Sequence, residues 1–202
     1  MTTSNIAIPE FRVSNESLLK RSMDVAGSCV LLVALAPFLA LVALLVKLDS
    51  RGPAIFRQKR IGKDGAPFEL WKFRSMRADA PPYERSPAST SDPRLTRLGR
   101  GLRRLSIDEL PQLVNVLKGE MSLVGPRPEM PFIVEKYGAL ERQRLRVKPG
   151  ITGLWQISPA RAMPIHENVE YDLFYIEHSS FFLDCSILLR TITAVVRGIG
   201  AA

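Results

Sequence analysis

The sequence predicts a mainly helical α+β domain that follows an N-terminal membrane segment. Residues 25–46 contain no charged side chain. Residues 54–61 and 67–73 form two short strand patterns around a turn, and several later stretches repeat apolar residues at helical spacing. We therefore expect a loose N-terminal arm at residues 1–18, a membrane-inserted segment at 19–49 and a folded domain at 50–202.

The composition is basic and does not decide between classes of partner. The chain of 202 residues has 28 Lys and Arg against 20 Asp and Glu, which gives a formal net charge of +8. Nucleic acid, anionic lipid and a phosphorylated small substrate all fit this balance. The two cysteines and two histidines show neither a disulfide framework nor a zinc-ligand spacing, so we expect a domain in the reducing cytosol.

The uncharged segment is long enough to cross the hydrocarbon core of a bilayer, which is about 30 Å thick. Pro37 lies near its middle and removes a helical hydrogen bond. Basic residues flank both ends, so the positive-inside rule gives no reason to place the two ends on opposite sides of the membrane. Two interpretations stay open: a helix that breaks at Pro37 and re-enters on the same side, and a kinked single span. The basic residues after position 56 place the following domain in the cytosol under either interpretation.

The two strand patterns predict a β-hairpin around Gly62-Lys63-Asp64-Gly65. The second strand leads into Trp71-Lys72-Phe73-Arg74, where cations alternate with aromatic rings. Such alternation fits a nucleotide clamp and fits equally an amphipathic strand that is half in the core. Four prolines between residues 80 and 93 then predict an exposed loop.

The adjacent acids Asp108 and Glu109 form the centre of the next stretch. Five arginines precede them between residues 94 and 104, and Gly125-Pro126-Arg127-Pro128 follows. Two neighbouring carboxylates repel each other, whereas each guanidinium favours the ionised form. One ion contact at about 4 Å is worth roughly 4 kcal/mol at an effective dielectric near 20. We expect the arginines to prevail and Asp108 to be ionised at neutral pH, as chemistry on an anion requires.

A purely structural interpretation of the same acids is helix capping. Residues 106–109 fit a capping box, and Asp108 alone fits an N-cap with Pro111 in the first turn. Apolar residues follow at helical spacing from Leu110 until Gly119 ends the helix. The two interpretations are compatible, because a helix N-terminus stabilises an anion and can hold phosphate.

Three further helices are expected. A charged helical stretch follows Pro131 and continues to about residue 147, where Pro149-Gly150 ends it. Residues 167–178 are helical in pattern. Residues 181–196 have so broad an apolar face that a core helix and an amphipathic helix at the bilayer interface both fit.

Several common catalytic motifs are absent from the sequence. It contains no GxSxG elbow, P-loop, GxGxxG after a strand or HExxH. An acid pair, many arginines and a membrane segment remain.

Six strings in order along the chain resemble the small monotopic phosphoglycosyl transferases, also called bacterial sugar transferases. They are KRSMDVAGS at 20–28, GPAIFRQKRIG at 52–62, KFRSM at 72–76, DPRLTRLGRGLRRLSIDELPQL at 92–113, MSLVGPRP at 121–128 and KPGITGLWQ at 148–156. The resemblance covers nearly all of residues 19–200.

This resemblance implies a membrane enzyme that starts bacterial glycan or exopolysaccharide assembly. Such enzymes transfer a sugar 1-phosphate from a UDP-sugar to polyprenol (undecaprenyl) phosphate and release UMP. They use Mg²⁺ and a ping-pong mechanism through a covalent phosphosugar on the aspartate. The resemblance also favours a re-entrant helix broken at Pro37, interfacial helices, and the cytoplasmic face of the bacterial inner membrane.

The resemblance implies roles for individual residues. Asp108 is the expected nucleophile and a metal ligand, and Glu109 is its acid/base neighbour. The expected substrate-binding residues are Lys72, Arg74, Arg104, Arg127 and Asp172, among which Arg104 and Arg127 would contact phosphate and nucleotide.

The chain departs from the family pattern at two places. Ala36 precedes Pro37 where many members have serine, and Arg161 lies one position later than the family arginine, so it is left out of the site. Two rival functions, a membrane-anchored nucleic-acid binder and a lipid-surface adaptor, give the acid pair no role. We therefore expect no nucleic-acid partner, and a homo-oligomer is compatible with the sequence.

Overall fold

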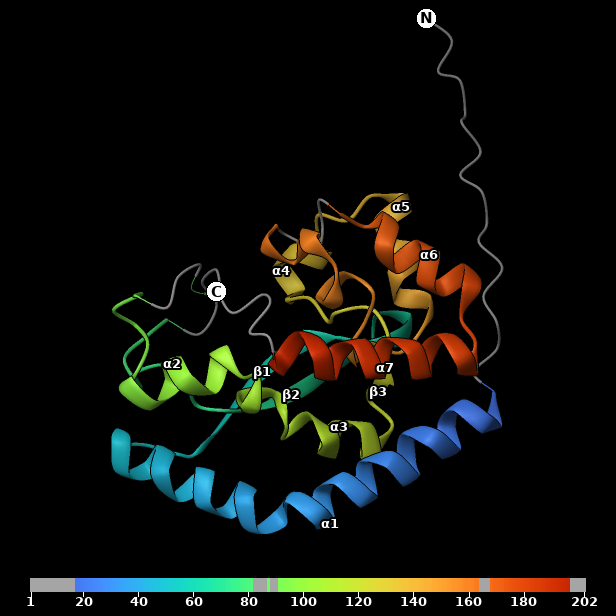
Figure 1. Cartoon of the computed structure of the whole chain (residues 1–202). Helices are drawn as coiled ribbons and strands as arrows, with labels where there is room; N and C mark the ends of the chain where they lie inside the picture. The colour runs from blue at the N-terminus through green and yellow to red at the C-terminus, as the bar shows by residue number, and fades with distance from the viewer. Residues whose placement is uncertain (1–16, 82–86, 88–90, 164–167, 197–202) are drawn as a thin grey trace, which may run out of the picture.

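The computed structural model describes residues 17–81, 87, 91–163 and 168–196 (Figure 1). Residues 1–16 of the expected arm, most of the loop at 80–93 and His166 lie outside these residues, whereas Ser17 and Leu18 already cap and begin the first helix. The described helices and strands, in chain order, are α1 (Leu18–Asp49), β1 (Ile55–Ile61), η1 (Lys63–Gly65), β2 (Pro67–Phe73), α2 (Arg97–Arg104), η2 (Ile107–Glu109), α3 (Gln112–Lys118), β3 (Ser122–Val124), α4 (Pro131–Val134), α5 (Ala139–Arg142), η3 (Gln143–Arg146), β4 (Gly150–Thr152), η4 (Trp155–Ile157), η5 (Pro159–Ala162), α6 (Glu170–His178) and α7 (Phe181–Val196). This order confirms a mainly helical chain with a small hairpin.

Helix α1 runs along one side of the domain, and α4, α5 and α6 lie at the opposite side (Figure 1). Among the described helices, it alone is long and apolar enough to cross a membrane. Pro37 lies inside α1, which continues through it as a helix of 32 residues in place of the two separate helices that we expected. A proline removes one hydrogen bond, and a long helix can absorb that loss by bending. The ribbon of α1 is bowed in Figure 1.

Polar side chains near the start of α1 connect it to the domain. Lys20 Nζ donates a hydrogen bond to Asp184 Oδ2 at 2.7 Å and to the Val124 carbonyl at 3.1 Å. The fully buried Asp24 accepts a hydrogen bond from a β3 amide at 2.9 Å. Arg21 donates to two carbonyls at the end of α3, at 2.7 and 2.9 Å. Residues of the string that begins at Lys20 therefore attach α1 to the domain.

The other end of α1 is held by Arg74. Its guanidinium donates hydrogen bonds to the carbonyls of Val46, Ser50 and Arg51 at 3.2, 2.6 and 2.9 Å. A cation at this position also complements the negative end of the helix dipole. Both ends of α1 are therefore attached to the same domain.

The hairpin forms at the predicted residues. Strands β1 and β2 pair antiparallel from Ile55 opposite Phe73 to Ile61 opposite Pro67. Three of the seven side chains of β2 are buried, so the strand is half in the core, as the amphipathic interpretation predicted, although its buried positions do not alternate strictly. The buried members of β2 are Phe68, Leu70 and Phe73.

The main core lies between the hairpin, α3, α6 and α7. Its fully buried residues include Leu113 and Val116 of α3 and Ile187 of α7. Helix α3 ends at Gly119, whose φ of 82° suits glycine, as the sequence predicted. A second cluster joins Val42 of α1 to Leu102 of α2.

A parallel pair of three-residue strands, β3 and β4, was not predicted. The two strands meet through glycine: a Cβ on Gly150 would lie 2.1 Å from the Gly125 nitrogen. No larger residue fits between backbones this close. This pairing places the Gly125-Pro126-Arg127-Pro128 segment beside the stretch that ends in Trp155.

The prediction of a single helix after Pro131 is wrong. The structure divides this stretch into α4, α5 and η3, and Gly138 precedes α5 in an extended conformation. The reason is tertiary: Arg144 of η3 is 3% exposed and turns inward. Helix α7 begins at the predicted residue, and it exposes Phe182, Leu189 and Ile192 while it buries Asp184 and Ile187.

Candidate active site

The acid pair lies in a tight turn between α2 and α3. Ser106 adopts a left-handed conformation with φ 54° and reverses the chain, and η2 then carries Asp108 and Glu109. The Ser106 side chain does not cap η2, and the N-cap of α3 is Pro111, which has no side-chain cap bond. The capping interpretation is therefore wrong, because neither acid caps a helix.

The two acids differ in their hydrogen bonds. Glu109 Oε1 accepts a hydrogen bond from Lys72 Nζ at 2.7 Å and one from Arg127 Nη1 at 3.5 Å. No residue that the structure describes donates a hydrogen bond to the Asp108 carboxylate, although Asp108 is only 6% exposed. The structure therefore leaves one acid of the pair free to react.

Burial and charge act in opposite directions on Asp108. Burial raises the pKa of its carboxyl and Glu109 adds to the rise, whereas Lys72, Arg103 and Arg127 oppose it. The net direction is upward, opposite to the effect of the arginines that we counted in the sequence. Desolvation, which no charge count contains, is the reason. Burial likewise lowers the pKa of Lys72, and both acids oppose that change.

Arg103, and not Arg104, is the arginine of α2 that faces the acids. The charge of Arg103 acts on Asp108, whereas the side chain of Arg104 is exposed. Helical spacing carries this signal: Arg104 shares its face with the exposed Arg97 and Arg100, and Arg103 lies four residues after the buried Gly99. The expected role of Arg104 therefore fits Arg103 better.

Two other expected substrate-binding residues are held by the protein itself. Arg74 is 6% exposed, and its terminal guanidinium nitrogens bind the end of α1. Asp172 is 1% exposed and accepts a hydrogen bond from Arg144 Nε at 2.6 Å. The structure thus brings Lys72, Arg127 and the acid pair together and places Arg74 and Asp172 in supporting positions.

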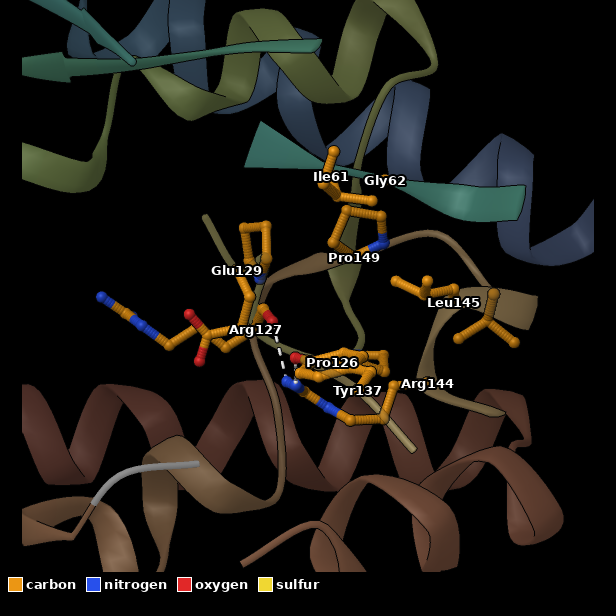
Figure 2. Close-up of a pocket in the computed structure, with 11 residues that line it drawn as sticks. Ile61, Gly62, Pro126, Arg127, Glu129, Tyr137, Arg144, Leu145 and Pro149 are labelled. Carbon is orange, nitrogen blue, oxygen red and sulfur yellow. Dashed lines mark hydrogen bonds between the residues drawn. The ribbon is translucent and has the colours of Figure 1, made fainter. Parts of the chain in front are cut away.

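The setting of Arg127 includes residues that the sequence analysis missed. Its guanidinium lies 5.9 Å from the ring centre of Trp155, which itself is buried. Behind the segment lies a small hollow, and Figure 2 shows Tyr137 and Arg144 on its wall beside Arg127. Neither acid lines this hollow, so it is separate from the acid pair.

The donor set of the acid pair fits magnesium. Mg²⁺ prefers oxygen ligands and commonly takes one or two carboxylates together with substrate phosphates. Asp108 offers a carboxylate without a hydrogen-bond donor, and Glu109 stands beside it in the same turn. The described residues contain no group of three or more His, Cys, Asp or Glu that could hold a metal, so phosphate oxygens and water would have to complete the shell.

Comparisons with known proteins identify the family of the chain. The family model described as bacterial sugar transferase matches residues 15–198. The chain is 48% identical over 193 residues to an undecaprenyl-phosphate glucose phosphotransferase of Komagataeibacter xylinus, covering 88% of this chain and 36% of that protein.

Two more relatives are similar. One is UDP-glucose:undecaprenyl-phosphate glucose-1-phosphate transferase of Escherichia coli K12, 45% identical over 87% of this chain and 39% of that protein. The other is the UDP-N-acetylgalactosamine-undecaprenyl-phosphate N-acetylgalactosaminephosphotransferase of Aeromonas hydrophila, 38% identical over 92% of this chain and 45% of that protein. The chain spans less than half the length of these three relatives. With its family model matched over nearly the whole chain, the protein belongs to the bacterial sugar transferase family.

Proposed function

We propose that this chain is a membrane-bound phosphoglycosyl transferase. It moves a sugar 1-phosphate from a UDP-sugar to undecaprenyl phosphate, releases UMP and so starts the assembly of a bacterial glycan. The names of the relatives support both substrates. The observation that carries the proposal is the buried Asp108 carboxylate. No described residue donates a hydrogen bond to it, and the charges of Lys72, Arg103 and Arg127 favour its ionised form.

The reaction proceeds in two displacements. An oxygen of Asp108 attacks the β-phosphorus of the UDP-sugar, and the bond from that phosphorus to the bridging oxygen breaks. UMP leaves with the electron pair, and the sugar phosphate stays on Asp108 as a mixed anhydride. An oxygen of undecaprenyl phosphate then attacks the same phosphorus, which restores the carboxylate and gives an undecaprenyl diphosphate sugar. Covalent capture means that the soluble donor and the lipid acceptor need not be bound together.

The cations make the approach of two anions feasible. Lys72, Arg103 and Arg127 neutralise charge on the diphosphate and on the departing UMP, in a site from which burial excludes most water. Glu109 keeps Lys72 in place at 2.7 Å and serves as the acid/base neighbour. Asp108 would hold Mg²⁺, and the bound ion would supply further neutralisation of the phosphate oxygens.

The attachment of α1 supports a re-entrant position in the cytoplasmic leaflet of the bacterial inner membrane. Lys20 and Arg74 hold the two ends of α1 on one domain, so both ends lie on the same side of the bilayer. The middle of the helix exposes apolar side chains such as Val33, at 77%, and Leu41, at 52%. The exposed apolar face of α7 suits the bilayer interface as well.

The five arginines between residues 94 and 104 do not all face the same way or have the same partners, which weakens the nucleic-acid alternative. Arg94 pairs with Asp92 at 2.7 Å, and Arg103 faces the acids. The exposed members of the run on α2 are Arg97, Arg100 and Arg104.

The relatives are named for different sugars. Relatives named for glucose and for N-acetylgalactosamine match this chain at 45% and 38% identity over similar shares of it. A panel of single UDP-sugars therefore belongs in every assay.

The proposal is tested with detergent-solubilised protein, Mg²⁺ and each UDP-sugar. Without acceptor, we expect about one UMP per protein and a phosphosugar on the peptide that contains Asp108. Added undecaprenyl phosphate makes the reaction catalytic. Asp108→Asn should lose on the order of 10³-fold or more in rate. Asp64→Asn, at the exposed hairpin turn, is the matched control and should keep full activity. Undiminished UMP release by Asp108→Asn would remove the assignment.

A further inference from the structure

A buried arginine supports the main chain of Arg127 from behind. Arg144 Nη2 donates a hydrogen bond to the Arg127 carbonyl at 2.9 Å. Its Nε donates to Asp172 Oδ2 at 2.6 Å, and its Nη1 donates to the Tyr137 hydroxyl. Figure 2 shows Arg144 and Tyr137 beneath the Arg127 segment. One guanidinium thus joins three separate parts of the chain.

Burial separates this group from any substrate. Arg144 is 3% exposed and Asp172 is 1% exposed. Burial lowers the pKa of the Arg144 guanidinium, but Asp172, Tyr137 and Glu129 together outweigh this effect, and the net direction is upward. The guanidinium of Arg127 points elsewhere, toward Glu109 at 3.5 Å and over the ring of Trp155. Arg144 can therefore act on the site only through the Arg127 main chain.

The Arg127 segment needs such support because of its prolines. Pro126 and Pro128 have no N–H, so these two residues can be held by hydrogen bonds only at their carbonyls. Four successive carbonyls each accept from a different donor: Pro126 from the Gly150 amide at 2.8 Å, Arg127 from Arg144, Pro128 from Arg60 Nη1 at 3.2 Å, and Glu129 from the Ile61 amide at 3.0 Å. The carbonyl of Arg127 accepts from a side chain, that of Arg144, so a single substitution can remove this donor.

We propose that Arg144, held in place by Asp172 and Tyr137, is a positioning residue for Arg127. It fixes the main chain from which the Arg127 guanidinium reaches the donor phosphates. This inference rests on the proposed function and gives Asp172 an indirect role in place of direct substrate contact. A displacement of about 1 Å in such a group can cost on the order of 10²-fold in rate.

The first test needs no activity. Hydrogen exchange of the main-chain amides is compared in the wild type, Arg144→Lys, Asp172→Asn and Tyr137→Phe. We expect the amides of Gly125 and Gly150 to exchange about 10- to 100-fold faster in the variants, because the segment they hold is loosened. The hairpin β1–β2 and α3 should keep their protection. Arg146→Lys is the control, since Arg146 lies on the same η3 and donates to Gln143.

The second test is a double-mutant cycle on UMP release. Arg144→Lys should lower kcat/KM about 30-fold in the wild type and less than about threefold when Arg127→Ala is already present. Tyr137→Phe removes one hydroxyl and gives a milder variant if Arg144→Lys fails to fold. Equal effects in both backgrounds, or exchange that rises evenly over the whole protein, would overturn the positioning role. A wild type that releases no UMP defeats the proposed function instead, and the exchange data still decide whether Arg144 holds the Arg127 main chain.

Discussion

Lys72 Nζ lies 2.7 Å from Glu109 Oε1, so the lysine of the hairpin pairs with the second acid of the turn. Asp108 receives the charge of Lys72 without a hydrogen bond from it. The neighbouring acids are therefore not equivalent: one is anchored and the other is free. This difference supports the proposal that Asp108 is the nucleophile.

The acid limb of the pH profile should move in opposite directions in two variants. The reaction needs ionised Asp108, whose pKa Lys72 lowers and Glu109 raises. Lys72→Met should therefore shift the loss of activity to higher pH, and Glu109→Gln should shift it to lower pH. Both variants also lose rate, Lys72→Met by about 10²-fold. The profile is measured as single-turnover UMP release, and Lys59→Met on the exposed face of β1 is the control. Shifts of the same sign would contradict this electrostatic account.

Adjacent arginines of α2 should behave differently. Arg103→Met removes a cation that acts on Asp108, and we expect UMP release to fall about 10²-fold. Arg104→Met alters an exposed residue and should change the rate less than about twofold, as is usual for surface substitutions. The pair is compared at saturating UDP-sugar and in parallel thermal denaturation. Greater loss in Arg104→Met would restore the role expected from the sequence.

Two glycine substitutions should affect stability with opposite signs. Gly150→Ala forces a Cβ to within 2.1 Å of the Gly125 nitrogen and should lower the free energy of unfolding by about 1–3 kcal/mol. Gly101→Ala lies in α2 with open space around the added carbon and should raise it by about 0.5–1 kcal/mol. Urea denaturation in detergent measures both. A neutral Gly150→Ala would mean that β3 and β4 are less closely packed than described.

Both ends of α1 should be accessible from the same side of the membrane. Single cysteines are introduced by Leu18→Cys and Arg51→Cys after replacement of Cys29 and Cys185, the two native cysteines. A membrane-impermeant maleimide should label both sites in inside-out vesicles and neither in intact spheroplasts. Labelling from opposite sides would establish a span and refute the re-entrant position.

Local signals explain what the sequence predicted well. The hairpin needs only an alternating pattern and a turn at Asp64-Gly65, and α3 needs only helical spacing and a final glycine. Helix α7 likewise begins at the predicted residue because its apolar pattern is long. These elements are set by residues close together in the chain.

Contacts between distant residues explain the rest. Strands β3 and β4 are three residues each and lie 28 positions apart in register, so neither has a pattern of its own. The partnership of Arg144 with Asp172 and the burial that raises the pKa of Asp108 exist only in the folded chain. Helical spacing distinguishes the inward-facing Arg103 from the exposed Arg104, but only once the buried face of α2 is known.

The two-point attachment of α1 bears on how the enzyme meets its lipid. Lys20 and Arg74 tie both ends of α1 to the body, so in the proposed membrane position the turn that carries Asp108 would keep a fixed depth. Lateral diffusion of the polyprenyl chain must then bring each acceptor to the enzyme. We expect turnover at limiting acceptor to follow membrane fluidity more closely than it follows the concentration of nucleotide sugar.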